Sequence, residues 1–194
     1  MSMTRKNAGV EKMVLAAILT ALVIVLQLAG QFIRFGIFSV SLVLVPIVLG
    51  AALCGVGVST WLGFVFGMVV LFQPDTQAFM SISVFGTVLT VLVKGALCGL
   101  VAGLVYAALA KKNRYFATVC AAVVCPLVNT GIFLLGTVVF FLDTVASWGV
   151  DAGFSSTFEY VVVGFVGVNF LAELVFNIVL SPVVVRLLNI RKRA

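Results

Sequence analysis

Residues 84–110 read VFGTVLTVLVKGALCGLVAGLVYAALA, an apolar run with a single charge, Lys94, near its middle. A helix needs about 20 apolar residues to cross a bilayer, so this run predicts a transmembrane helix. Residues 160–188 form a similar run with Glu173 near its middle. A charge at the bilayer centre costs at least about 2.5 to 3.5 kcal/mol on insertion scales and normally faces protein or water. Lys94 and Glu173 therefore indicate an interior polar site.

The composition extends this conclusion to the whole chain. Hydrophobic residues make up 63% of the 194 residues, charged residues 9%, and the mean hydropathy is +1.32. These values predict an all-α integral membrane protein that forms one bundle, with room for about six crossings and no separate globular domain. Residues 1–12 resemble the basic start of a signal peptide, but no small-residue cleavage site follows, so we expect a retained first helix.

The predicted spans cover residues 10–30, 40–55, 57–72, 84–110, 116–142 and 160–188. The second and third are short and are separated by Cys54-Gly55-Val56-Gly57, a glycine-rich sequence that suits a tight helical hairpin. Fusing them gives an alternative with five spans, one of which is much longer than a bilayer requires.

The distribution of charge gives an independent test of the topology. With both termini cytoplasmic, the inside segments hold most of the 12 basic residues, namely Arg5, Lys6, Lys12, Lys111, Lys112, Arg114, Arg186, Arg191, Lys192 and Arg193. The outside loops hold Arg34, Asp75, Asp143, Asp151 and Glu159. This is the positive-inside pattern of a multi-pass protein. The net charge of +6 thus reflects topology and contact with anionic lipid, and no nucleic-acid partner is expected.

Catalytic and metal-binding motifs are absent from the sequence. It has no histidine, which removes Ser-His catalysis and histidine metal sites, and it has no Walker A pattern for ATP. The four cysteines, Cys54, Cys98, Cys120 and Cys125, lie within or at the ends of apolar segments and form no recognisable disulfide or metal motif. We expect no enzyme activity, no cofactor and no metal.

Small residues mark the faces on which helices approach one another. Gly95, Gly99 and Gly103 recur on one stripe, and Gly63 and Gly67 recur on the preceding span. Such rows allow close backbone contact between membrane helices, so we expect these two spans to pack together. Ala17 and Ala21 form a similar pair on the first span, where alanine is a weaker signal.

Polar residues in the last three spans point to one interior face. Asn169, Glu173 and Asn177 follow one stripe of the last span, and Asn129 and Lys94 lie near the middle of the two before it. One interpretation is a structural Lys94–Glu173 ion pair with asparagines that bond helices together. The other is a solute pocket, which outside residues could cover, namely Arg34, Phe72, Gln73 and Asp75. Trp61 suits an interfacial anchor.

Several segments together resemble a known family. They are residues 11–22 (EKMVLAAILTAL), 41–51 (SLVLVPIVLGA), Val93-Lys94-Gly95 and 125–133 (CPLVNTGIF). Their order, spacing and predicted topology resemble the substrate-binding S components of energy-coupling factor (ECF) vitamin transporters.

The resemblance implies a binding subunit in the plasma membrane that captures a vitamin from outside. Its implied partners are a transmembrane coupling subunit, which Ala17 and Ala21 would face, and two cytoplasmic ATPases that energise uptake. The family also implies that the loaded subunit topples in the membrane to deliver its ligand. Ligands in the family usually lie toward the outer half, which fits Lys94, Asn129 and Asn169 better than Asn177.

The choice of ligand depends on the charge state of the site. A cationic Lys94 favours an anionic vitamin such as pantothenate, whereas neutralisation by Glu173 leaves a neutral vitamin such as riboflavin equally suitable. Two other functions stay open: an ion-coupled transporter or channel that works alone, and a purely structural subunit.

Overall fold

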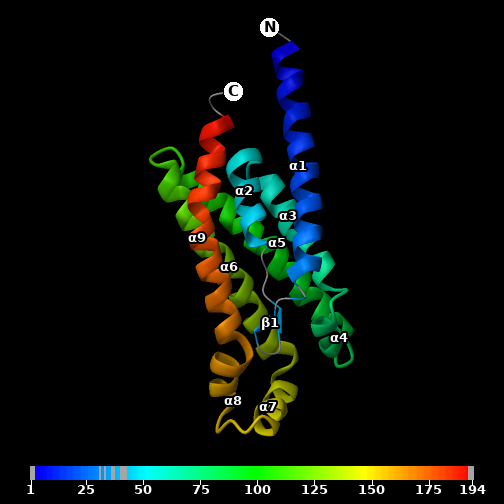
Figure 1. Ribbon diagram of the computed structural model, residues 1–194. Coiled ribbons are helices and arrows are strands. Elements are labelled where there is room, and N and C mark those ends of the chain that lie inside the picture. The colour runs from blue at the N-terminus through cyan, green and yellow to red at the C-terminus, as the bar shows by residue number, and fades with distance from the viewer. Residues whose placement is uncertain (1–2, 31, 33, 36–37, 40–42, 192–194) are drawn as a thin grey trace.

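The apolar runs form helices that lie side by side along one long axis (Figure 1). The computed structural model describes the backbone of residues 3–30, 32, 34–35, 38–39 and 43–191, and side chains for 9–30, 32, 43–163, 167, 170–180 and 182. In chain order, the long elements are α1 (Met3–Gly30), α2 (Leu44–Cys54), α3 (Val56–Val70), α5 (Val84–Leu109), α6 (Arg114–Phe140) and α9 (Val168–Arg191). Two short strands, β1 (Arg34–Phe35) and β2 (Phe38–Ser39), pair antiparallel after α1.

The described helices confirm an all-α membrane protein apart from this small hairpin. Residues 9–30 of α1, all of α5 and all of α6 are long and apolar enough to cross a membrane. A fourth crossing is obtained if α3 and α4 (Pro74–Met80) count as one span bent by 76°. Three or four spans therefore follow from length and composition in the described residues, and the arrangement with six spans stays a prediction.

The segments expected to be outside loops contain short helices. They are α4, α7 (Leu142–Asp151) and α8 (Thr157–Glu159), and a π-helix, η1 (Tyr160–Gly167), then leads into α9. Gln73 is extended and Pro74 is the first residue of α4, a combination that favours a new helix start after α3. These helices are too short to give a clear periodic signal in the sequence.

A glycine separates α2 from α3, so the two short helices do not fuse into one. Gly55 has φ 97°, a conformation that costs glycine little and most other residues considerably more. The helices pack against each other across this turn. Leu62 of α3 lies against Gly50 of α2, where an added Cβ would collide with the leucine.

The predicted glycine seam joins α3 to α5. A Cβ added at Gly63 or Gly95 would collide with the backbone carbonyl of the other residue, and one at Gly99 would collide with the carbonyl of Ser59. Packing rather than hydrophobic burial holds helices together in lipid, and small residues maximise that contact. The expectation that these spans touch inside the bundle is confirmed.

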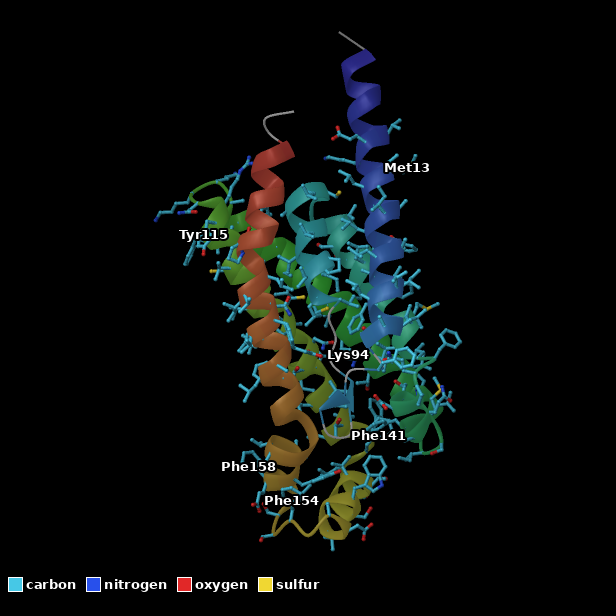
Figure 2. The ribbon with its side chains drawn as sticks, in the orientation of Figure 1. Met13, Lys94, Tyr115, Phe141, Phe154 and Phe158 are labelled. Atoms are coloured by element: carbon cyan, nitrogen blue, oxygen red, sulfur yellow. The ribbon has the colours of Figure 1, made fainter. Side chains whose placement is uncertain are left out.

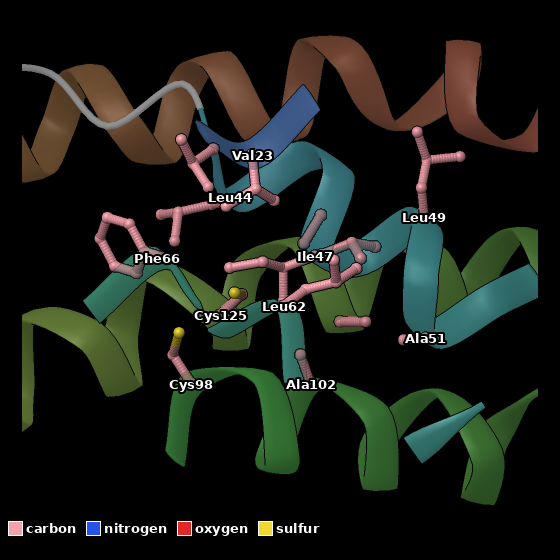
Figure 3. Close-up of a cluster of buried hydrophobic side chains, with 14 of the residues drawn as sticks. Val23, Leu44, Ile47, Leu49, Ala51, Leu62, Phe66, Cys98, Ala102 and Cys125 are labelled. Carbon is pink, nitrogen blue, oxygen red and sulfur yellow. The ribbon is translucent and has the colours of Figure 1, made fainter. Parts of the chain in front are cut away.

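The main hydrophobic core lies between these helices and α1, α2 and α6 (Figure 3). Its largest fully buried side chains include Phe66, Leu44, Ile47 and Leu62. Val23 brings α1 into the same cluster. This core is one continuous apolar cluster, and the more polar residues of α5, α6 and α9 lie beside it.

The two ends of the molecule differ in charge. The start of α1, the end of α9 and the α5–α6 turn lie at one end, and α7 and α8 lie at the other (Figure 1). The turn carries the exposed basic residues Lys111, Lys112 and Arg114, whereas α7 and α8 carry the exposed acids Asp143, Asp151 and Glu159. Basic and acidic side chains described here thus gather at opposite ends.

Candidate functional site

Two facing stripes of α5 and α6 carry the polar residues of the interior. Thr90, Lys94 and Cys98 recur at steps of four on α5, and Cys125 and Asn129 do so on α6. Residues four apart share one face of a helix, and α5 packs closely against α6 along their lengths. Thr90, Cys98, Cys125 and Asn129 are buried. The two helices therefore enclose a ladder of polar groups.

The thiols of Cys98 and Cys125 form one rung of the ladder, and both residues belong to the main hydrophobic core. They are in hydrogen-bonding contact, and Figure 3 shows their sulfur atoms facing each other. The Cys98 thiol also donates to the Gly95 carbonyl, with a sulfur–oxygen distance of 3.1 Å. The pair is a dithiol rather than a disulfide. It closes the polar ladder on the side of the basic end.

Lys94 forms the next rung and lies among aromatic rings. Its ammonium nitrogen is 4.9 Å from the centroid of Phe133 on α6 and 6.0 Å from that of Phe66 on α3. A cation over a ring gains about 0.5 to 2 kcal/mol, more when water is excluded. Figure 2 places Lys94 between the end that carries Tyr115 and the end that carries Phe154. The charge thus lies between the two ends of the molecule, beside rings of α3 and α6.

Glu173 of α9 completes the charged pair. It interacts electrostatically with Lys94, and its side chain is buried. Two charges brought together inside protein offset part of the cost of removing each from water. Whether the two side chains form a structural ion pair or a ligand site stays a prediction, and α9 packs against α6, the helix that carries Asn129 and Cys125.

Three buried oxygen atoms of α5, α6 and α9 accept no hydrogen bond from the described residues. They are Thr90 Oγ1, Asn129 Oδ1 and Asn177 Oδ1. The Asn177 amide nitrogen donates to the Glu173 backbone carbonyl at 2.8 Å, so this side chain is only half satisfied. A buried unsatisfied group costs about 1 to 3 kcal/mol, and such groups in a cluster are typical of a site that receives donors from a bound molecule or water.

An aromatic cluster lies beyond Lys94, toward the acidic end. Its centre is Phe79 of α4, whose ring meets Phe133 at 6.0 Å, Phe141 at 5.1 Å and Trp148 at 5.5 Å between centroids, each nearly edge-on. Buried Tyr160 belongs to the same cluster. Phe133 contacts both Lys94 and Phe79, so it joins the polar ladder to the aromatic rings.

The remaining predicted site residues lie elsewhere or beyond description. Gln73 is buried at the α3–α4 bend, where it bonds with Gln27 of α1. Arg34 lies in β1 and Asn169 near the start of α9, but both side chains fall outside the described set. Phe72 is 80% exposed, and exposed Trp61 donates its indole N–H to Thr20 Oγ1 at 3.3 Å.

Several residues of the site were missed by sequence reasoning. Thr90 and Gln27 are polar residues inside apolar runs, a signal that could have found them. Phe79 and Phe133 gave no signal, because the 17 phenylalanines are scattered along the chain from Phe32 to Phe176. Trp148 lies in a segment that was expected to be an outside loop.

The chemistry of this cluster suits binding of a polar solute. A charged pair supplies strong directional contacts, the amide and hydroxyl oxygens accept hydrogen bonds, and the rings supply apolar contact area. Within the described residues, no group of three or more Cys, Asp or Glu side chains comes together to hold a metal ion.

Comparison with known proteins points to one family. The family described as ECF transporter, substrate-specific component, matches residues 11–185, which is most of the chain. No curated protein and no solved structure matches the chain.

Proposed function

Because the chain belongs to the family of ECF transporter substrate-specific components, we propose that it captures a B-type vitamin at the Lys94 site, with pantothenate as the favoured ligand. The observation that supports the proposal is the electrostatic contact of Lys94 with Glu173 together with three buried oxygens that accept no hydrogen bond from the described residues. Thr90 lies one turn from Lys94, Asn177 one turn from Glu173, and Asn129 on α6, which packs against both helices. A subunit that must hold a polar molecule inside a membrane needs such a cluster, whereas a purely structural bundle does not.

Pantothenate matches the groups of the ladder one by one. Its carboxylate suits the Lys94 ammonium, and its two hydroxyls and its amide N–H can donate to Asn129, Thr90 and Asn177. Arg34 and Asn169 remain candidates for the same site, with Gln73 acting from the α3–α4 bend.

Riboflavin is the second candidate because of the aromatic cluster. A flat ring system could stack beside Phe133, Phe79 and Trp148, and a Lys94 already neutralised by Glu173 would need no anionic ligand.

The first test identifies the ligand directly. The protein is purified in mild detergent, any retained small molecule is identified by mass spectrometry, and pantothenate and riboflavin are then titrated into the stripped protein. Near-stoichiometric pantothenate, or tight binding of it alone, supports the proposal. Retention of riboflavin assigns the second candidate, and an empty protein that binds neither removes both.

We further propose that uptake needs a coupling subunit and two ATPases. Liposomes that contain this chain alone should bind but not accumulate ligand, and addition of an energising module with ATP should start accumulation. Accumulation driven by an ion gradient, with this chain alone, would instead assign a stand-alone transporter.

Six spans with cytoplasmic termini are proposed for the topology in the plasma membrane. The gathering of basic residues at the end that carries the termini and of acidic residues at the other supports this orientation. In intact cells, a membrane-impermeant maleimide should label Asp151→Cys, whereas Lys112→Cys should react only after permeabilisation. The reverse pattern would invert the protein.

A further inference from the structure

A buried pair of glutamine side chains connects α1 to the bend between α3 and α4. Gln27 Nε2 donates to Gln73 Oε1 at 2.9 Å, and Gln73 Nε2 donates to the Gln27 backbone carbonyl at 3.2 Å. Gln27 is 2% exposed and Gln73 is 4% exposed. One bond joins the two side-chain amides and the other holds the Gln73 amide to the backbone of α1, so the Gln73 side chain is fixed at both its oxygen and its nitrogen, away from water.

The position of Gln73 gives this pair control over α4. Gln73 is the extended residue immediately before Pro74, at the point where the chain turns by 76°. Its backbone carbonyl accepts hydrogen bonds from the Thr76 and Gln77 amides of α4. Fixing the Gln73 side chain therefore fixes the direction in which α4 leaves α3.

The next contact leads from α4 to the ligand site. Phe79, on α4, contacts Phe133, and the Phe133 ring lies under the Lys94 ammonium. Phe79 also meets Trp148 of α7. A change in the direction of α4 thus displaces the ring at the centre of the aromatic cluster.

We propose that Gln27 and Gln73 are positioning residues, a joint by which α1 sets the α3–α4 bend and so holds Phe79 against the ligand site. The pair leaves one acceptor unsatisfied, because Gln27 Oε1 is buried and accepts no hydrogen bond from the described residues. The proposal rests on the proposed function only for the identification of Lys94 as part of a ligand site. Movement of α1 would, through this joint, reach the aromatic cluster.

Trp148 provides a reporter that needs neither ligand nor partner. The chain has two tryptophans, so Trp61→Phe leaves Trp148 as the sole source of indole fluorescence. In this background, Gln27→Leu, Gln73→Leu and the double variant are compared in detergent by thermal unfolding, emission maximum and acrylamide quenching. Val23→Ala is the matched control, since Val23 is buried one turn earlier on α1 and belongs to the main core.

Each single variant should lower the unfolding temperature, shift Trp148 emission to longer wavelength and steepen quenching. The double variant should recover most of the lost stability, because neither amide is left buried without its partner, but it should keep the altered fluorescence. Val23→Ala should lower the unfolding temperature while Trp148 fluorescence stays unchanged.

Two results would overturn the joint. Unchanged Trp148 fluorescence in both single variants would reduce the pair to a local structural contact. An equal change in Val23→Ala would show that any loosening of α1 reaches Trp148. Neither result bears on ligand identity, which the retained-ligand experiment decides separately.

Discussion

Lys94 is held by contacts that a bound anion could replace. Its ammonium lies over Phe133 and interacts with Glu173, so removal of the charge deletes the strongest donor of the ladder. A hydrogen bond to a charged group contributes about 1.5 to 3 kcal/mol. Lys94→Met should therefore weaken pantothenate binding roughly tenfold to a hundredfold, measured by titration calorimetry of the stripped protein.

The control for this variant is the same substitution at an exposed lysine. Lys112 lies in the α5–α6 turn, far along α5 from the ladder, and Lys112→Met should leave the affinity unchanged. Equal affinities of the Lys94→Met and parent proteins would remove Lys94 from the ligand site and leave it a structural role.

Asn129 tests the amide part of the ladder. Its Oδ1 is buried and accepts no hydrogen bond from the described residues, so we expect it to receive one from the ligand. Asn129→Leu should weaken binding about tenfold while stabilising the empty protein slightly, because a buried unsatisfied group is removed. Calorimetry and thermal unfolding measure the two effects. A loss of stability without loss of affinity would contradict the assignment.

At the scale of helices, the seam between α3 and α5 is set by backbone contact. Gly99→Ala places a methyl group against the Ser59 carbonyl, which cannot move without shifting α3. This substitution should lower the thermal unfolding temperature by several degrees.

Gly131→Ala on α6 is the matched comparison, since a Cβ there meets nothing within 4 Å. It should leave the unfolding temperature unchanged or slightly raised, because alanine favours a helix over glycine. Similar losses in both variants would mean that glycine is needed for helix flexibility rather than for close contact.

The elements that could be predicted from sequence are those with one strong local signal. Lys94, Glu173 and Asn129 are polar groups within long apolar runs. The glycine rows of α3 and α5 predict that these two helices pack against each other. The aromatic cluster and the α3–α4 bend depend on which helices contact each other. The sequence around Phe79 and Gln73 gives no indication of these contacts. The hairpin between α1 and α2 and the helices before α9 are too short for periodicity to reveal.

At the scale of the whole molecule, one face of α1 is open. Ala17 and Ala21 are exposed, together with larger residues of the same helix such as Met13 at 70% and Ile18 at 58%. Changing Ala17 and Ala21 together to leucine should leave ligand binding intact but reduce copurification with the coupling subunit and ATPases, because larger side chains prevent close helix approach. Pull-down and transport assays measure both.

Ala107 and Ala108 of α5 provide the control surface, since both are also exposed. Leucine at these two positions should alter neither binding nor assembly. Normal assembly of the Ala17→Leu, Ala21→Leu variant would remove this face of α1 from the partner interface.

The π-helix before α9 decides which way that helix faces. At 3.6 residues per turn, the 13 steps from Tyr160 to Glu173 would leave the two side chains pointing about 140° apart. Both are nevertheless buried, Tyr160 in the aromatic cluster and Glu173 where it interacts with Lys94. A π-helix closes its hydrogen bonds over one more residue than an α-helix, so it rotates the chain less per residue. The wider turn of residues 160–167 therefore reduces the rotation between Tyr160 and Glu173. The length of this segment thus allows the aromatic cluster and Glu173 to face the interior together.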